Sequence, residues 1–274
     1  MKAAFYERNE AIRIGEIPKE PPGPGEVQVK VAYSGICGTD LHIFHGVMDT
    51  RVAPQQIMGH EISGTVAALG EGVTGYAVGD KVTVMPLDSC GECPACKAGH
   101  SHICLNLNFL GIDTPGGFQS FWNVPAKTIL RLPENLSMQT GALIEPLAVA
   151  CHDVRLGGIT ADDYVVVLGG GPIGMLIALV VQNVGANVIV SEINPTRVSI
   201  GHDLGLEVVN PQQIDLVSFV NAWTDGAGAD AVFEVTSHAS GAEMMTKLPR
   251  TRGRIIQVGI FGKPPIVDLK AILW

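Results

Sequence analysis

The sequence predicts an α/β protein in which a β-rich N-terminal domain precedes a doubly wound parallel sheet. Short β segments broken by glycine and proline fill the first half of the chain, and strands alternate with helices from residue 164 onward. A glycine-rich turn joins the first strand of that alternation to its helix. We therefore expect a first domain over residues 1–150 and a second over residues 151–274.

The first domain has the pattern of a β-barrel or sandwich. Apolar and polar residues alternate with a period of two in its segments, as expected for strands with one buried face. The expected strands are residues 26–35, 61–69, 80–85 and 118–124. The composition changes near Ser137, where helix-like spacing begins behind a capping serine and continues to residue 155.

The second domain reads as repeated strand–helix units. Continuous Val/Ile runs predict parallel strands that are buried on both faces. The expected strands are residues 164–169, 187–192, 206–210, 230–235 and 253–259, with helices from Pro172, from Pro195, near 212–223 and near 240–248. The chain ends in "VDLKAILW", which has the pattern of an unfinished element.

Composition narrows the class of partner. With 46% hydrophobic and 16% charged residues, the 274-residue chain can bury a substantial core. Its formal net charge of -9 disfavours nucleic acid and anionic membrane surfaces, so we expect a small-molecule substrate. The chain starts without an apolar signal core, and its longest apolar run is too short to cross a bilayer, so we expect a cytoplasmic protein.

A dinucleotide-binding motif follows the strand at residues 164–168. The motif G-x-G-x-x-G opens a helix and consists of Gly169, Gly171, Pro172, Ile173 and Gly174. Its glycines allow a tight turn, a close approach to a pyrophosphate and close packing of the helix on the strand. Glu192 ends the next strand, where a carboxylate accepts hydrogen bonds from ribose hydroxyls and repels a 2′-phosphate. We therefore expect NAD rather than NADP, although Arg197 nearby keeps NADP as an alternative.

Four cysteines crowd into a segment that we delimit as residues 88–106. Cys90, Cys93, Cys96 and Cys104 have the spacing C-x2-C-x2-C-x7-C. Four thiolates complete a tetrahedral shell, so a structural Zn²⁺ site is expected. An iron–sulfur cluster is the rival, but the ferredoxin run has a different last spacing and a following proline. Disulfides are the other alternative, and a reducing cytosol disfavours them.

A second set of metal-ligand types is spread over three segments. Cys37 lies in "GICGTDLHIFHG", His60 and Glu61 lie in "MGHEISG", and Glu145 lies in the apolar "ALIEPLAVA". An ionised carboxylate in an apolar setting is costly without a cation. Thiolate, imidazole and carboxylate together suit a Zn²⁺ ion that keeps one position open for exchange.

These segments together resemble the zinc-dependent medium-chain dehydrogenase/reductase family, most closely its polyol branch of sorbitol and butanediol dehydrogenases. The segments are "GICGTDLH", "GHEISGTVAALGEGVTGYAVGDKV", the four-cysteine lobe, "ALIEPLAVA" and "VVVLGGGPIG". The resemblance covers essentially the whole chain. It implies a GroES-like β domain with a catalytic zinc, a Rossmann domain with the nicotinamide cofactor, and an active site in the cleft between them.

The resemblance also implies roles for single residues. Cys37 and His60 match the constant ligands of the catalytic zinc. Glu61 matches a glutamate that ligates in some members, and Glu145 matches one that either ligates zinc or holds its water. The resemblance is compatible with either Glu61 or Glu145 as the resting zinc ligand.

Three further residues match the family's proton-handling groups. Asp40 matches the carboxylate that orients the ligand histidine, whose second ring nitrogen needs a partner. Thr39 resembles the hydroxyl that takes the substrate proton, and His42 resembles the histidine that passes it to solvent. Taken alone, Thr39 and Asp40 are also compatible with local helix capping, and His42 with a solvated loop.

The expected activity is hydride transfer between a secondary alcohol of a polyol, sugar alcohol or diol and NAD, with two Zn²⁺ per chain. The alternatives are an L-threonine-type dehydrogenase, an NADP-dependent alcohol reductase, and a nucleotide-binding paralogue without turnover. Family members continue for several dozen residues beyond this length, so the sequence is expected to be a C-terminally truncated fragment. The full-length protein is expected to form a homodimer or homotetramer.

Overall fold

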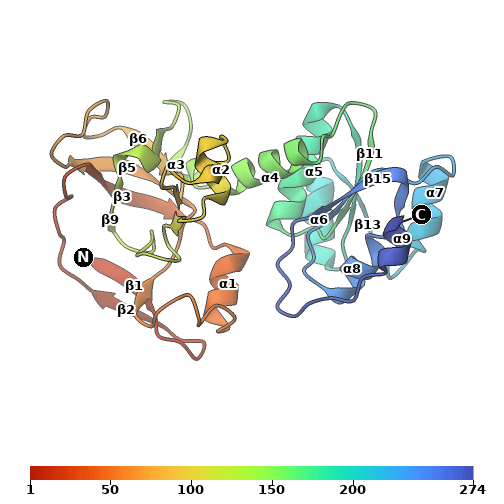
Figure 1. Cartoon of the computed structure of the whole chain (residues 1–274), viewed down its shortest axis with the longest axis horizontal. Coiled ribbons are helices and arrows are strands. Elements are labelled where there is room, and N and C mark those ends of the chain that lie inside the picture. The colour runs from red at the N-terminus through yellow and green to blue at the C-terminus, as the bar shows by residue number, and fades with distance from the viewer. Residues whose placement is uncertain (274) are drawn as a thin grey trace. The chain divides into compact units, whose positions relative to one another are not determined.

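The computed structural model describes residues 1–273 and divides into two compact units, Met1–Glu145 and Pro146–Trp274 (Figure 1). The division falls within helix α4 (Ile144–Leu156). The first unit is built from antiparallel strands, and the second contains a parallel sheet. The predicted α/β class is confirmed.

The N-terminal unit contains two main antiparallel sheets. The smaller has the order β2-β1-β4, and the larger has the order β10-β6-β5-β3-β9. The predicted strands at 26–35, 61–69, 80–85 and 118–124 are confirmed as β3, β5, β6 and β9 within a few residues. The bounds are β1 Lys2–Tyr6, β2 Ile12–Glu16, β3 Glu26–Ser34, β4 Gln56–Ile57, β5 Ile62–Leu69, β6 Lys81–Val84, β9 Phe121–Pro125 and β10 Ile129–Arg131.

Inward-facing branched side chains hold the larger sheet together. Val27 and Val29 on β3 pack with Ile62 and Val66 on β5 in a cluster that includes the buried ring of Trp122. Short elements border this core and carry most of the polar motifs. They are α1 Gly38–Phe44, β7 Leu87–Asp88, α2 Pro94–Lys97, η1 Ser101–Ile103, β8 Asn108–Phe109, η2 Ala126–Thr128 and α3 Met138–Gly141.

The helix predicted from Ser137 to residue 155 is two helices. Ser137 caps α3 by accepting a hydrogen bond from the Thr140 N–H, as expected, but α3 ends at Gly141. A new helix, α4, begins at Ile144, which places Pro146 in its first turn. Proline has no N–H to donate to a preceding turn, so it is tolerated only near a helix start. The break follows from this restriction.

The C-terminal unit is a five-stranded parallel sheet of order β13-β12-β11-β14-β15. Successive residues of β11 face opposite sides, with Val165 and Val167 packing in the cluster that contains α5, and Val166 and Leu168 in the cluster that contains α7 and α8. Both faces are therefore covered, as the continuous apolar runs predict. The bounds are β11 Tyr164–Leu168, α5 Pro172–Val184, β12 Asn187–Ser191, α6 Pro195–Asp203, β13 Glu207–Val209, α7 Leu216–Trp223, β14 Ala229–Glu234, α8 Ala239–Met244, β15 Pro249–Gln257 and α9 Leu269–Leu273.

Two predicted helix boundaries in this unit are wrong. The helix expected from residue 212 begins at Leu216, because the Asp215 side chain caps it by accepting from the Ser218 N–H. The helix expected over 240–248 ends at Met244, and the following residues enter β15 at Pro249. The final segment, read as unfinished, forms the short helix α9 over its described residues.

Candidate active site

The polar segment over residues 35–46 contains a helix, α1, rather than only a loop. Cys37 is the residue that precedes its first turn, and the Cys37 N–H donates to Asp40 Oδ2 at 2.9 Å. The capping role considered for Asp40 is therefore present. It fixes the Cys37 backbone at the helix start, and Thr39 contacts the Cys37 sulfur through its N–H and hydroxyl.

His60 and Glu61 lie immediately before β5. Gly59 precedes them with φ of 94°, in the left-handed region, and a Cβ there would collide with the Phe118 ring. A Cβ at Gly35 would collide with Glu61 Oε2. Glycine at both positions lets the segment before β5 approach the segment before α1.

This approach brings three predicted ligands together. The Cys37 sulfur, a ring nitrogen of His60 and a carboxylate oxygen of Glu61 all lie within 4.8 Å of one another. Glu145 is outside this set, but it lies close enough to Glu61 and Asp40 for their charges to affect its pKa. Within residues 1–273, none of these acids forms an ion pair with lysine or arginine.

Burial disfavours charge throughout the cluster. Desolvation raises the pKa of Cys37 to about 11 and that of Asp40 to about 6. Desolvation, and then the charges of Glu61 and Asp40, raise the pKa of Glu145 to about 7. Burial lowers the pKa of His60 to about 4, which keeps its imidazole neutral and able to ligate a metal. A bound cation would favour the thiolate and carboxylate forms, so this donor set fits a metal ion.

The orientation of His60 provides a second observation. Its Nδ1 lies 3.9 Å from Asp40 Oδ1, and both are buried atoms without a hydrogen-bond partner among the described residues. The Phe109 and His60 rings pack at nearly a right angle, with centroids 5.3 Å apart. Nδ1 is thus turned toward Asp40, as is common for a ligand histidine whose other nitrogen binds the metal. The sequence offered no signal for Phe109.

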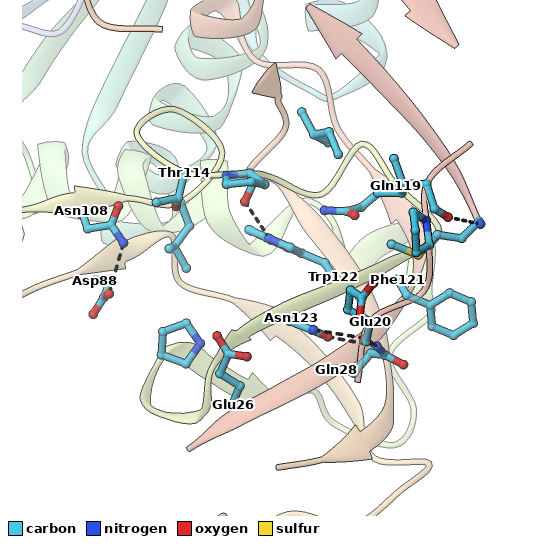
Figure 2. Close-up of a pocket in the computed structure, with 17 residues that line it drawn as sticks. Glu20, Glu26, Gln28, Asp88, Asn108, Thr114, Gln119, Phe121, Trp122 and Asn123 are labelled. Carbon is cyan, nitrogen blue, oxygen red and sulfur yellow. Dashed lines mark hydrogen bonds between the residues drawn. The ribbon is translucent and has the colours of Figure 1, made fainter. Parts of the chain in front are cut away.

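A cavity of about 550 Å³ lies elsewhere in the N-terminal unit (Figure 2). Acidic and amide side chains such as Glu26, Gln28 and Asn123 line it together with Trp122, whose ring N–H donates to the Pro115 carbonyl. No cysteine or histidine lines this cavity. It therefore has no residue in common with the Cys37–His60–Glu61 cluster.

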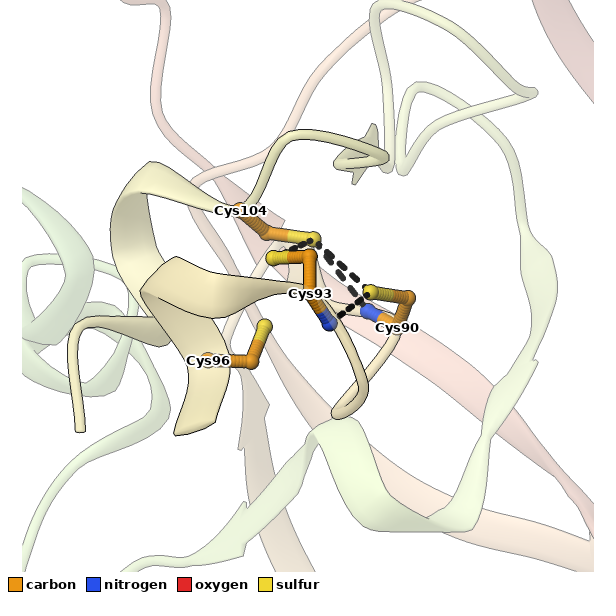
Figure 3. Close-up of side chains that lie close together, drawn as sticks. All are labelled: Cys90, Cys93, Cys96 and Cys104. Carbon is orange, nitrogen blue, oxygen red and sulfur yellow. Dashed lines mark hydrogen bonds between the residues drawn. The ribbon is translucent and has the colours of Figure 1, made fainter. Parts of the chain in front are cut away.

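The four cysteines of the segment 88–106 converge around α2 (Figure 3). Their sulfurs all lie within 4.8 Å of one another, and all are free thiols, so the disulfide alternative is not what the structure shows. N–H groups point at the sulfurs, and those of Glu92 and Cys93 lower the pKa of Cys90 to about 6. A shell of four sulfurs with thiolate-stabilising donors fits a tetrahedral metal ion.

The glycine-rich turn has the geometry that its sequence predicts. Gly169 has φ of 104°, and a Cβ at Gly174 would collide with the Gly169 carbonyl. Gly171 precedes the first turn of α5, and nothing lies within 4 Å of a Cβ placed there. Pro172 and Ile173 begin the helix, so its first N–H groups are available to an anion.

Glu192 is 5% exposed and anchored by backbone donors. Its Oε2 accepts from the Gly170 N–H, and its Oε1 accepts from the Ile193 and Asn194 N–H groups, each at 2.8 Å. Arg197 Nη1 lies 3.7 Å from Oε2. The carboxylate therefore sits directly beside the glycine-rich turn.

A second buried acid in this unit was missed from the sequence. Glu234 ends β14 and is fully buried. The available signal was the one used for Glu192, an acidic residue at the end of an apolar strand.

Comparison with known proteins identifies the family. Residues 23–134 match the model of the alcohol dehydrogenase GroES-like domain, and residues 172–273 match that of zinc-binding dehydrogenases. The chain belongs to the zinc-dependent medium-chain dehydrogenase/reductase family, and it is an oxidoreductase of the zinc alcohol dehydrogenase type.

Three curated relatives cover most of the chain. A 2-dehydro-3-deoxy-L-galactonate 5-dehydrogenase of Pseudoalteromonas atlantica is 52% identical over all of this chain and 80% of its own length. An L-threonine 3-dehydrogenase of Pyrococcus furiosus is 38% identical over 94% of this chain and 74% of its own. A sorbitol dehydrogenase of Halalkalibacterium halodurans is 35% identical over 92% and 74%.

Solved structures agree on the fold. A zinc-binding dehydrogenase of Sinorhizobium meliloti bound to NADP has a TM-score of 0.93 and 34% identity over 99% of this chain and 81% of its own. An alcohol dehydrogenase of Escherichia coli complexed with NADH has a TM-score of 0.90 and 33% identity over 100% and 80%. Separately, no helix within residues 1–273 has the length and apolar character that a bilayer crossing requires.

Proposed function

We propose that the protein is a zinc- and NAD-dependent dehydrogenase that interconverts a secondary hydroxyl group of a polyol or sugar acid with the ketone. The observation that carries this proposal is the cluster formed by the side chains of Cys37, His60 and Glu61, with Glu145 close by. Among the described residues, no lysine or arginine balances the charge of these acids. A nucleotide-binding paralogue without turnover would have no use for this costly set of groups.

Two metal sites follow from the donor sets. Cys37, His60 and one of the carboxylates Glu61 and Glu145 would hold a catalytic zinc, while the four-cysteine lobe would hold a structural one. The proximity of Glu61 to Cys37 and His60 favours Glu61 as the resting ligand. A bound zinc ion supplies a Lewis acid that polarises a hydroxyl oxygen and makes its proton easier to remove.

The chain's own residues orient the site and move the proton. Asp40 Oδ1 faces His60 Nδ1 at 3.9 Å, a position from which the carboxylate can orient the ring. Thr39 lies beside the Cys37 sulfur, where its hydroxyl can relay a proton by releasing its own as it takes one from a substrate hydroxyl. His42 follows Thr39 by three residues on α1, so both lie on the same helix face and His42 can carry the proton onward.

The C-terminal unit would bind the nicotinamide cofactor, which accepts the hydride. The backbone of the glycine-rich turn and the first N–H groups of α5 are suited to its pyrophosphate. Glu192 is held rigidly beside this turn, where a fixed negative charge accepts ribose hydroxyls and opposes a 2′-phosphate. This supports NAD over NADP. Arg197, which could pair with that phosphate, lies near Glu192 instead.

For the substrate, we propose a sugar acid or polyol because the Pseudoalteromonas relative, at 52% identity, is named for an oxidised sugar acid. The second candidate is L-threonine, since the Pyrococcus relative is 38% identical. Both are secondary alcohols with neighbouring polar groups, so the same metal chemistry serves either.

The test combines zinc analysis with an assay panel. We expect two zinc ions per purified chain, and reduction of NAD⁺ by a sugar acid or polyol to exceed that by L-threonine. Cys37→Ser should lose one zinc and lower kcat at least about 100-fold, because the donor set is broken. The matched control is Cys151→Ser, an exposed cysteine outside both clusters, which should change neither. One zinc in the wild-type chain, with no turnover on any substrate, would support the inactive paralogue instead.

A further inference from the structure

A buried acidic hub joins two loops at the end of β14. Glu234 Oε1 accepts from the N–H of Thr236 at 2.8 Å and from its hydroxyl, and Oε2 accepts from Gln257 Nε2 at 2.9 Å. The Glu234 main-chain carbonyl also accepts from the N–H groups of Val258 and Gly259. One fully buried residue thus ties the loop after β14 to the loop after β15.

The hub borders the glycine-rich turn. A Cβ added at Gly169 would lie 3.1 Å from Thr236 Cγ2, so the threonine methyl packs on the first glycine of the motif. A Cβ at Gly259 would lie 2.8 Å from the Ser237 N and Oγ atoms. Ser237 itself has φ of 56°, a left-handed conformation that costs energy for a residue with a side chain. The surrounding bonds hold this loop in a shape it would not adopt alone.

The strand order indicates which half of a dinucleotide this loop would face. In the order β13-β12-β11-β14-β15, the connection reverses between β11 and β14, and ligands of open parallel sheets bind outside the strand ends at such a point. Glu192 follows β12, on one side of β11, and marks the adenosine side. Glu234 ends β14, on the other side, and therefore faces the nicotinamide half.

We propose that Glu234 is a positioning residue for the nicotinamide half of the cofactor, acting through Thr236 and the loop after β15. This rests on the proposed function. The carboxylate does not need to touch the cofactor. It accepts three hydrogen bonds, two from Thr236 and one from Gln257, and these bonds restrain both loops.

The test compares two ligands that differ in the nicotinamide. ADP-ribose has the adenosine and pyrophosphate parts of NADH but lacks the nicotinamide ring. The ratio of the Kd of NADH to the Kd of ADP-ribose therefore reports on binding of the nicotinamide. We expect a rise of about five- to tenfold in the Kd of NADH for Glu234→Gln and for the milder Thr236→Val, because each loses one or two hydrogen bonds. The Kd of ADP-ribose should change less than about twofold in either variant. Calorimetry measures both dissociation constants.

Thr224→Val is the matched control. Its buried hydroxyl donates to the Val220 carbonyl and accepts from the Gly228 N–H, just before the start of β14 and so at the other end of this strand from Glu234. It should lower Tm without changing the ratio of the two constants. Equal shifts for both ligands in Thr236→Val, or no shift, would overturn the positioning role. A wild-type chain that binds neither ligand would overturn the proposed function, and this inference with it.

Discussion

Desolvation perturbs single acids in both units. Desolvation raises the pKa of Asp40 to about 6, that of Glu145 to about 7 and that of Asp153 to about 6. The first two lie beside candidate zinc ligands, where a cation can offset the cost. Asp153, on α4, belongs to neither candidate metal cluster of residues 1–273, and its Oδ2 is buried without a hydrogen-bond partner among them.

Asp153→Asn should therefore stabilise the protein at neutral pH. The pKa of Asp153 is higher in the folded state than in the unfolded chain, so the folded state binds the proton more tightly, and stability falls as pH rises from about 4 to about 6. Because the side chain is partly exposed, solvent screens the cost, and we expect a gain of about 1 kcal/mol at pH 7.

Most of the gain should disappear near pH 3.5, where the carboxyl is mostly protonated in both states. Thermal denaturation at the two pH values measures it, with a rise in Tm of about 3 °C expected only at pH 7. Asp162→Asn is the matched control, because Asp162 is exposed and asparagine tolerates its positive φ. A gain that is equal at both pH values would contradict the electrostatic explanation.

Among the secondary-structure elements, α2 in the four-cysteine lobe depends most on a bound metal for its stability. Its helix α2 has four residues, and none of them is buried. Such a short exposed helix has little intrinsic stability, so the sulfur cluster has to hold the segment. Removing the metal should therefore unfold this segment before the sheet beside it.

Trypsin cleavage after Lys97 tests this expectation, because Lys97 is the last residue of α2 and is exposed. Cys93→Ser, or treatment with a chelator, should accelerate this cleavage at least about tenfold, since a released structural zinc leaves its loop disordered. Cleavage after Lys247, exposed in the C-terminal unit, provides the internal control and should keep its rate. Equal rates with and without metal at Lys97 would show that the lobe folds without it.

Across the whole molecule, the two units have separate hydrophobic cores. The cluster that contains Val29 and Ile62 has only residues of the first unit, and the two clusters around Val167 and Val232 have only residues of the second. The proposed ligands are divided in the same way, with the cofactor elements in the second unit and the metal ligands in the first.

NADH should consequently stabilise the C-terminal unit more than the N-terminal one. At a hundred times its Kd, a ligand that binds only the folded state adds about 2.7 kcal/mol. Trp223, whose ring packs edge-on against Tyr164, reports on the second unit, while buried Trp122 reports on the first. Single-tryptophan variants followed by fluorescence during heating measure each. An equal rise for both probes would indicate that the units unfold together.

Local patterns were enough to predict which segments form strands and where the glycine-rich turn lies, and they singled out both groups of candidate metal ligands. Alternation and Val/Ile runs depend on which face of a strand is buried, and the turn at Gly169 depends on glycine's access to positive φ, so these signals are written in neighbouring residues. Helix ends were less predictable. The break before α4 depends on Pro146, and the start of α7 depends on which acid caps it.

The sequence alone establishes which chemical groups are available: four closely spaced thiols, a separate set of thiol, imidazole and carboxylate, and a glycine-rich turn before a helix. Which of these groups lie close together depends on the tertiary structure. Cys37 and His60 come together because glycines at 35 and 59 let two distant segments approach, and Glu234 accepts hydrogen bonds from both the loop after β14 and the loop after β15. Contacts between residues that are distant in the sequence depend on long-range packing and burial, which no local pattern encodes.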